Sequence, residues 1–448
     1  MTLENLLLFA ALAASAGLCD YRSLFGLRNI VIFYVFAIYN IAPRVHGDGE
    51  TELSLWTFEF LAVLVCFIVG YGVGAEDVST ADGPAPVRFP LPQRRLRTLL
   101  RLMYVFIGLQ LALLVASIAS VGLVRFYAGA ILVDMIQSYG QADAAGAFEQ
   151  VLAFVVKMLG TALLAVLLQN HWLEQQAERR GYSDGRRPQR VLGVAVFWWV
   201  ILPGLQFARA AVLFGALSYL AVRSHLSASR TRMRSLFLAV VAAAFFVYVG
   251  ATRERALGFE ARSSIGFFIA ELTPWTVYSE IKGNMHLLDY QYGRTILMPL
   301  ALRAIPRGIY PAKPQNSSGY VATVLHPEAF EAGFGIPPTY MGDLYLNFGI
   351  AGVLVGTLLI GFSAARVDGL TRWRGRADLG LFAVAFSFYP SLMRENLATT
   401  LFTVGVSLSV YKLMSLWAFP GERSVRFVRG TARNSSGMHG GGLLRVET

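Results

Sequence analysis

The chain has 448 residues, of which 55% are hydrophobic and only 15% are charged. A soluble domain carries about 25% charged residues, so the composition excludes an ordinary soluble protein and indicates an integral membrane protein. The formal net charge of +11 is compatible with nucleic-acid binding, but the arginines lie in short segments between apolar runs, where they indicate membrane topology and lipid contact. We therefore expect a lipid bilayer, and no nucleic acid, as a partner.

Apolar runs near the 20-residue length of a membrane-spanning helix predict an all-α polytopic protein with about eleven transmembrane helices. The predicted helices cover residues 4–18, 29–44, 54–74, 100–122, 148–169, 191–206, 208–223, 235–251, 343–364, 378–393 and 396–417. Residues 1–251 would form an N-terminal bundle of about eight helices, and residues 343–418 a C-terminal group. The glycine-rich end, 419–448, is expected to be a flexible tail.

Arginines concentrate in alternate connectors, which must share one side of the membrane. The richest connectors contain Arg88, Arg94, Arg95, Arg97 and Arg101, then Arg179, Arg180, Arg186, Arg187 and Arg190, and later Arg366, Arg372, Arg374 and Arg376. The positive-inside rule makes that side cytoplasmic. The N-terminus is then predicted outside and the C-terminus inside.

The interval 252–342 is the longest polar stretch of the chain, and it is predicted to lie outside. Its many aromatic and aliphatic residues predict a folded, partly helical loop. Its cations are Arg253, Arg255, Arg262, Lys282, Arg294, Arg303, Arg307 and Lys313. Solvated surface charge would account for them, but Arg209 and Arg394 add two arginines at outer ends of predicted spans, where an arginine is costly without a partner. We therefore favour an anion-binding active site in this loop.

The chain shows no metal-ligand spacing, no phosphate-binding glycine loop and no dinucleotide fingerprint. No cofactor or metal is expected. A cationic outer pocket above an apolar bundle suits the anionic headgroup of a lipid, since arginine binds phosphate bidentately and keeps its charge when desolvated. Pyrophosphate on a polyprenyl tail is the ligand that this combination favours, with the arginines offsetting the charge of the leaving group.

Three stretches resemble the Wzy-type O-antigen and exopolysaccharide repeat-unit polymerases. They are IPRGIYPAKP, which contains Arg307, FGIPPTYMGDLYLNFGIAGV, which closes the long loop, and FARAAVLFGALSYL, which contains Arg209. Members of this family are polytopic, with a large outside loop between late helices and essential arginines in outside loops. Asp343 stands where the family pattern has a glutamate, so a carboxylate is kept on a shorter side chain.

The resemblance implies a GT-C-like glycosyltransferase of the bacterial cytoplasmic membrane. It would move a growing glycan from undecaprenyl pyrophosphate onto the non-reducing end of the next lipid-linked repeat unit, at the periplasmic face. A polysaccharide chain-length regulator would be a further partner. The predicted substrate-binding residues are Arg209, Arg253, Arg255, Arg294, Arg307, Lys313, Tyr340 and Arg394, and the candidate general bases are Glu280, His326 and Asp343.

Two other functions stay open at this point. An O-antigen ligase would share the topology and the arginines but would hand the glycan to the lipid A core. A flippase or transporter should carry charges deep in its spans and show internal repeats. Lys157 is one of few charges within a span, and no repeat is evident.

Replacing Arg209 or Arg307 with alanine is expected to abolish glycan chain growth, because each guanidinium would bind pyrophosphate or sugar at the outer face. The measurement is the length distribution of surface glycan, with the level of the protein checked by immunoblot. A wild-type distribution in either variant would remove that arginine from the site.

Overall fold

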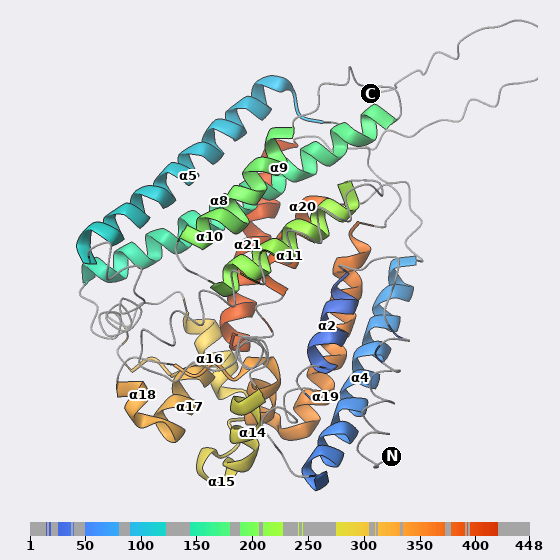
Figure 1. Ribbon diagram of the computed structural model, residues 1–448, viewed down its shortest axis with the longest axis vertical. Helices are drawn as coiled ribbons and strands as arrows, with labels where there is room; N and C mark the ends of the chain where they lie inside the picture. Colours follow the sequence, from blue (N-terminus) through green and yellow to red (C-terminus); the bar gives the residue numbers. More distant parts are fainter. Residues whose placement is uncertain are drawn as a thin grey trace, which may run out of the picture.

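A computed structural model of the chain describes residues 15, 18, 26–36, 39, 50–79, 90–121, 144–179, 189–205, 209–226, 241, 244, 275–303, 310, 312–331, 335–371, 378–389, 392 and 395–419. The regular elements in these ranges are all helices (Figure 1). The first group is α2 (Leu27–Phe36), α4 (Glu50–Ser79), α5 (Gln93–Val121), α8 (Ala144–Arg179), α9 (Gln189–Val196), the π-helical turn η2 (Phe197–Ile201), α10 (Leu202–Leu205) and α11 (Arg209–Leu226). The second group is α14 (Trp275–Gly283), α15 (Met285–Leu288), α16 (Arg294–Leu302), α17 (Ser317–Leu325), α18 (Pro327–Glu331), α19 (Thr339–Gly369), α20 (Leu379–Phe388) and α21 (Leu397–Ala418).

Five of the described helices are long and apolar enough to cross a membrane. These segments are Trp56–Ala75, Gln93–Ala116, Phe154–Glu178, Thr339–Gly369 and Leu397–Ala418. The predicted all-helical membrane architecture is therefore confirmed. The count of about eleven spans stays a prediction, because α2, α9–α10 and α20 are shorter helices and the predicted spans 4–18 and 235–251 fall mostly outside the described residues.

Helix α8 is the centre of the bundle. Its apolar window is 78% buried, whereas the other four candidate spans are 22–39% buried. A helix that is apolar around its whole circumference needs neighbours on every side, and α5, α20 and α21 all pack against α8. The second main packing is between α4 and α19, which lie along one another with α2 beside them (Figure 1).

Helix ends that border the arginine-rich connectors meet at one end of the bundle. The carboxylate of Asp368, near the end of α19, accepts the backbone N–H of Leu27 at 3.1 Å and so caps the start of α2. The side-chain oxygen of Asn170, late in α8, accepts the N–H of Leu91 at 2.6 Å, just before α5. The helices of the long loop, α14 to α18, gather at the opposite end (Figure 1).

Helix α19 is broken at Gly349, which has a φ of +64°. The carbonyls of Leu346 and Asn347 consequently accept the N–H groups of Gln291 and Tyr292, both at 3.1 Å. The Asn347 side chain adds a hydrogen bond from the N–H of Gly293 at 2.8 Å. The sequence Asn-Phe-Gly therefore ends one helical segment and fixes the loop upon it.

The long loop has a small apolar core of its own. Ile281, Leu288 and Val321 are buried together with Leu346 of α19. Leu346 belongs to the part of α19 before the break, so the loop helices pack against that part of α19.

Replacing Gly349 with alanine should destabilise the protein by about 1–3 kcal/mol, the usual cost of holding a side chain in left-handed backbone geometry. A Cβ there would also lie 3.3 Å from the hydroxyl of Tyr290. Thermal unfolding in detergent measures the loss. The matched control is Gly405→Ala, where a Cβ meets nothing within 4 Å, so unchanged or slightly higher stability is expected. Equal thermal stability of the two variants would contradict this account of the break.

Candidate functional site

The first turn of α21 is contacted by α19 and by the residue that follows α16. Asn396 caps the helix by accepting the N–H of Thr399 at 2.8 Å. Asp343, from the part of α19 before the break at Gly349, accepts the N–H of Leu397 at 2.6 Å. The Asp343 side chain is fully buried. The predicted base Asp343 therefore holds the start of α21 in this structure.

A second oxygen of Asp343 remains available for another partner. The hydroxyl of Ser317, the first residue of α17, lies beside the carboxylate. Among the described residues, none makes a hydrogen bond of normal geometry to Oδ1 of Asp343 or Oγ of Ser317. The two groups are enclosed, so a substrate would reach Asp343 only after the start of α17 had moved.

Cations surround the same turn of α21. Nη1 of Arg303, directly after α16, donates to Oγ1 of Thr399 at 2.7 Å, and the guanidinium lies 5.6 Å from the ring centre of Phe402. Nζ of Lys313 donates to the carbonyl of Arg303 at 3.3 Å. Lys157 of α8 is close enough to Glu395 for their charges to interact. We call Lys157, Arg303 and Lys313 the cation cluster.

The environment of Arg303 favours an anionic ligand. Burial lowers the pKa of Arg303, and the charge of Glu395 opposes that shift. A partly desolvated guanidinium keeps its charge and its planar set of donors, which suits phosphate oxygens. The positive end of the α21 dipole points to the same place. The arrangement can therefore bind an anion such as a phosphate at the end of the bundle where the loop helices gather.

Glu280 and His326, the two other predicted bases, form a pair. Nε2 of His326 lies 2.7 Å from Oε1 of Glu280, and the side chains are 40% and 32% exposed. His326 caps the C-terminal end of α17, while Ser317 begins this helix. At 1.5 Å per residue, the pair lies about 13 Å along α17 from the Asp343 end. The structure thus places the three predicted bases at two separate positions.

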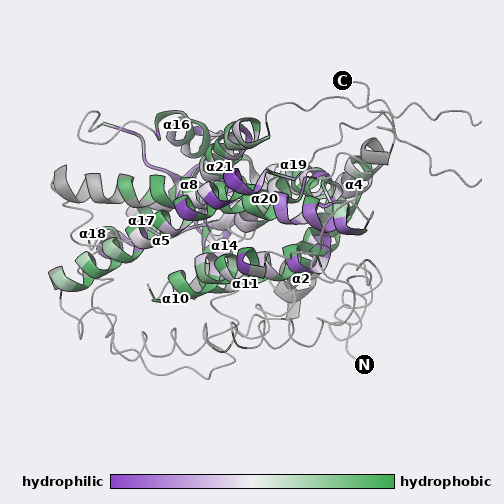
Figure 2. Cartoon of the chain, turned by 90° about the horizontal axis from the view of Figure 1, so that it is seen from above, coloured by the Kyte–Doolittle hydropathy of each residue, from purple (hydrophilic) through white to green (hydrophobic). Residues whose placement is uncertain are grey.

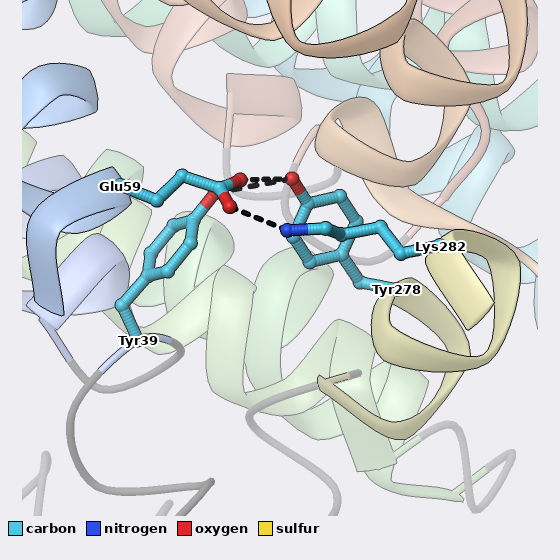
Figure 3. Close-up of polar contacts among 4 residues, drawn as sticks. All are labelled: Tyr39, Glu59, Tyr278 and Lys282. Carbon is cyan, nitrogen blue, oxygen red and sulfur yellow. Dashed lines mark hydrogen bonds and ion pairs between the residues drawn. The ribbon is translucent and has the colours of Figure 1, made fainter. Parts of the chain in front are cut away.

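A buried carboxylate on α4 fixes the loop to the bundle (Figure 3). Oε2 of Glu59 lies 2.5 Å from Nζ of Lys282, and Oε1 accepts hydrogen bonds from the hydroxyls of Tyr278 and Tyr39, the latter at 3.1 Å. The ammonium of Lys282 also lies 3.8 Å from the ring centre of Trp56. We call Tyr39, Trp56, Glu59, Tyr278 and Lys282 the Glu59 cluster.

Burial, together with the charge of Glu59, raises the pKa of Tyr278 well above its usual value. Tyr278 therefore remains a hydrogen-bond donor across the physiological range. Because Lys282 and Tyr278 lie four residues apart on α14, one face of that helix carries both contacts to α4.

The remaining predicted site residues have varied positions. Arg294 is exposed at the start of α16, whereas Tyr340 is buried within α19. Arg209 begins α11, and its side chain is not among those described. Arg253, Arg255, Arg307 and Arg394 lie outside the described residues.

The sequence did not point to Glu59 or Glu395 as site residues. It indicated Arg303 only as one of the cations of the interval 252–342. A glutamate inside the apolar run LSLWTFEFLAVL was a usable signal for Glu59, since such a charge requires partners. Within the described residues, no group of three His, Cys, Asp or Glu side chains is placed to hold a metal ion.

Two known proteins are similar in sequence to part of this chain. The chain is 36% identical over 130 residues to the O-antigen polymerase of Salmonella typhimurium and, to the same extent, to that of Salmonella typhi. Each match covers 26% of this chain and 31% of the relative, so the chain spans about a third of the length of these curated relatives. No family model and no solved structure matches the chain. The similarity confirms the predicted resemblance to Wzy-type polymerases over that part.

Replacing Glu59 with glutamine should destabilise the protein by about 3 kcal/mol, because the mostly buried ammonium of Lys282 loses its counter-charge. Lys282→Met should cost less, since Glu59 keeps its two tyrosine donors, and the double variant should cost less than the two single changes together. Thermal unfolding in detergent tests this, with the exposed Glu328→Gln as control. Additive losses would show that the two side chains are not coupled.

Proposed function

We propose that this protein polymerises lipid-linked oligosaccharide repeat units at the periplasmic face of the bacterial cytoplasmic membrane. The O-antigen polymerases similar to part of the chain support the reaction class. The observation that carries the proposal furthest is the cation cluster at the outer end of an apolar bundle, which suits a pyrophosphate attached to a lipid. The donor would be a growing glycan on undecaprenyl pyrophosphate, and the acceptor the next lipid-linked repeat unit.

The cation cluster would stabilise the leaving group. The acceptor hydroxyl attacks the anomeric carbon of the donor, and the bond from that carbon to the pyrophosphate oxygen breaks. The bond's electron pair leaves with undecaprenyl pyrophosphate. Arg303 is already oriented by Thr399 and Phe402, so its charge needs little reorganisation to offset the charge that develops. In this proposal the cations carry out that task without a metal ion.

The base that takes the acceptor proton must lie close to the pyrophosphate, since the anomeric carbon is bonded directly to it. The Glu280–His326 pair is about 13 Å away along α17, a distance that suits contacts with sugars further along the glycan. Glu395 is exposed and interacts with the charges of Arg303 and Lys157. We therefore assign the proton to Glu395 or, after an opening motion, to Asp343.

The test of function is deletion in the native bacterium, with surface glycan resolved on a gel and lipid-linked intermediates extracted. Single repeat units in place of a ladder are expected, and re-expression of the chain should restore the ladder. Full-length glycan held on the polyprenyl carrier would indicate a ligase instead. Repeat units held on the cytoplasmic leaflet would indicate a flippase.

Replacing Arg303 with alanine should lower the polymerisation rate by about 100-fold or more, the usual effect of removing one donor to a developing anion. Arg303→Lys should fall between alanine and wild type, because it keeps the charge and loses the planar fork. Turnover of a labelled lipid-linked repeat unit in isolated membranes measures both. Arg97→Ala is the control, because that arginine is exposed near the start of α5, on the side of the predicted cytoplasmic connectors. A wild-type rate in Arg303→Ala would exclude the cation cluster from the reaction.

A further inference from the structure

The break in α19 fixes where the outer boundary of the membrane lies on this helix. From Ile350 to Gly369 the segment has 20 residues, which at 1.5 Å each is about 30 Å, the thickness of the hydrocarbon core. With Gly369 at one boundary of the hydrocarbon region, Gly349 would lie at the other. The loop segments bonded to this break lie at the level of the lipid headgroups.

Helix α16 presents apolar side chains outward at this level. Leu297 and Met298 are 63% and 48% exposed, while Thr295, Ile296 and Pro299 are buried against the protein. Figure 2 shows α16 at the edge of the molecule, with apolar colouring over much of its length. A contiguous apolar face of this kind is typical of a contact with an apolar partner.

The turn before α16 presents two tyrosines beside that face. Tyr290 and Tyr292 are exposed, and their ring centres lie 6.3 Å apart. Tyr292 has a φ of +46°, a geometry that non-glycine residues rarely adopt. The N–H of Tyr292 is held by the carbonyl of Asn347, at the break of α19. The ring of Tyr292, which is 79% exposed, is thus held outward, whereas the hydroxyl of Tyr290 lies beside Tyr345 and Gly349.

The apolar surface continues without interruption onto the lipid-facing side of α19. At Gly293, a Cβ would lie 3.3 Å from Leu297 Cδ1 and equally 3.3 Å from Phe348 Cζ, so these two side chains flank the same point. Phe348 is itself 47% exposed. Further along α19, the exposed large apolar side chains are Ile350, Val355, Leu358 and Leu359. These belong to the segment that crosses the membrane.

We propose that α16 and the turn before it lie in the outer leaflet of the bilayer. The docking surface consists of Tyr290, Tyr292, Leu297, Met298 and Phe348, and its partner is phospholipid. The apolar side chains would contact acyl chains, while the hydroxyl of Tyr292 and the exposed Arg294 would lie among the headgroups. Continuity with the exposed face of α19 favours lipid over a glycan or a protein partner.

This placement would also set the depth of the cation cluster. Arg303 follows the last residue of α16 directly, so an α16 held in the leaflet keeps that guanidinium near the headgroups. The inference about α16 does not depend on the polymerase reaction.

Fluorescence quenching in lipid nanodiscs tests the proposal. The full chain, with Cys19 and Cys66 replaced by alanine, would carry one new cysteine at a time, labelled with an environment-sensitive fluorophore. Leu297→Cys and Met298→Cys probe the docking surface. Val355→Cys on the exposed side of α19 is the lipid control, and Glu328→Cys on α18 is the water control. Spin-labelled phospholipid and iodide are the two quenchers.

The proposal predicts that the probes at 297 and 298 lose fluorescence to spin-labelled lipid and resist iodide, as at 355. Quenching by iodide alone, as expected at 328, would overturn it and leave the face open for glycan. Resistance to both quenchers would also overturn it, because protein would then cover the face.

Discussion

The backbone of α19 leaves helical geometry at Gly349, and the loop helices are attached to the backbone groups that this break frees. Two freed carbonyls and the side chain of Asn347 bind the turn at 291–293. The segment before the break carries Leu346 into the core of the loop and Asp343 to the start of α21. One helix therefore crosses the apolar layer and also sets the position of the polar layer above it.

Buried carboxylates join segments that are far apart in the sequence. Glu59 binds α14 to α4, Asp343 binds α19 to α21, and Asp368 caps α2 at the other end of the bundle. Such charges contribute little to net stability after desolvation, but leaving one of them unpaired is costly. They therefore favour one arrangement of the helices over others with similar apolar contacts. The cation cluster needs such a fixed arrangement, because its members come from α8, from the residue after α16 and from the loop.

The sequence was sufficient to predict the helical membrane class and helices within the long polar interval, because these depend on composition and on the lengths of apolar runs. It did not predict which side chains meet. Asp343 was expected at the reaction centre and is enclosed against α21, while Glu280 and His326 pair with each other although 46 residues separate them. Arg303 is oriented by a hydrogen bond to Thr399, which lies on a later helix. Residue type and local spacing carry no information on these long-range contacts.

The most direct test of the central claim is reconstitution of the purified protein in vesicles with a single substrate, a polyprenyl-pyrophosphate-linked repeat unit that serves as donor and acceptor. Mass spectrometry would follow the lipid-linked products over time. The account predicts a series of chains that differ by one repeat unit, with one polyprenyl pyrophosphate released for each unit added. If the folded protein produced no chain longer than a single repeat unit, or released the glycan into water without extending it, the claim would be contradicted.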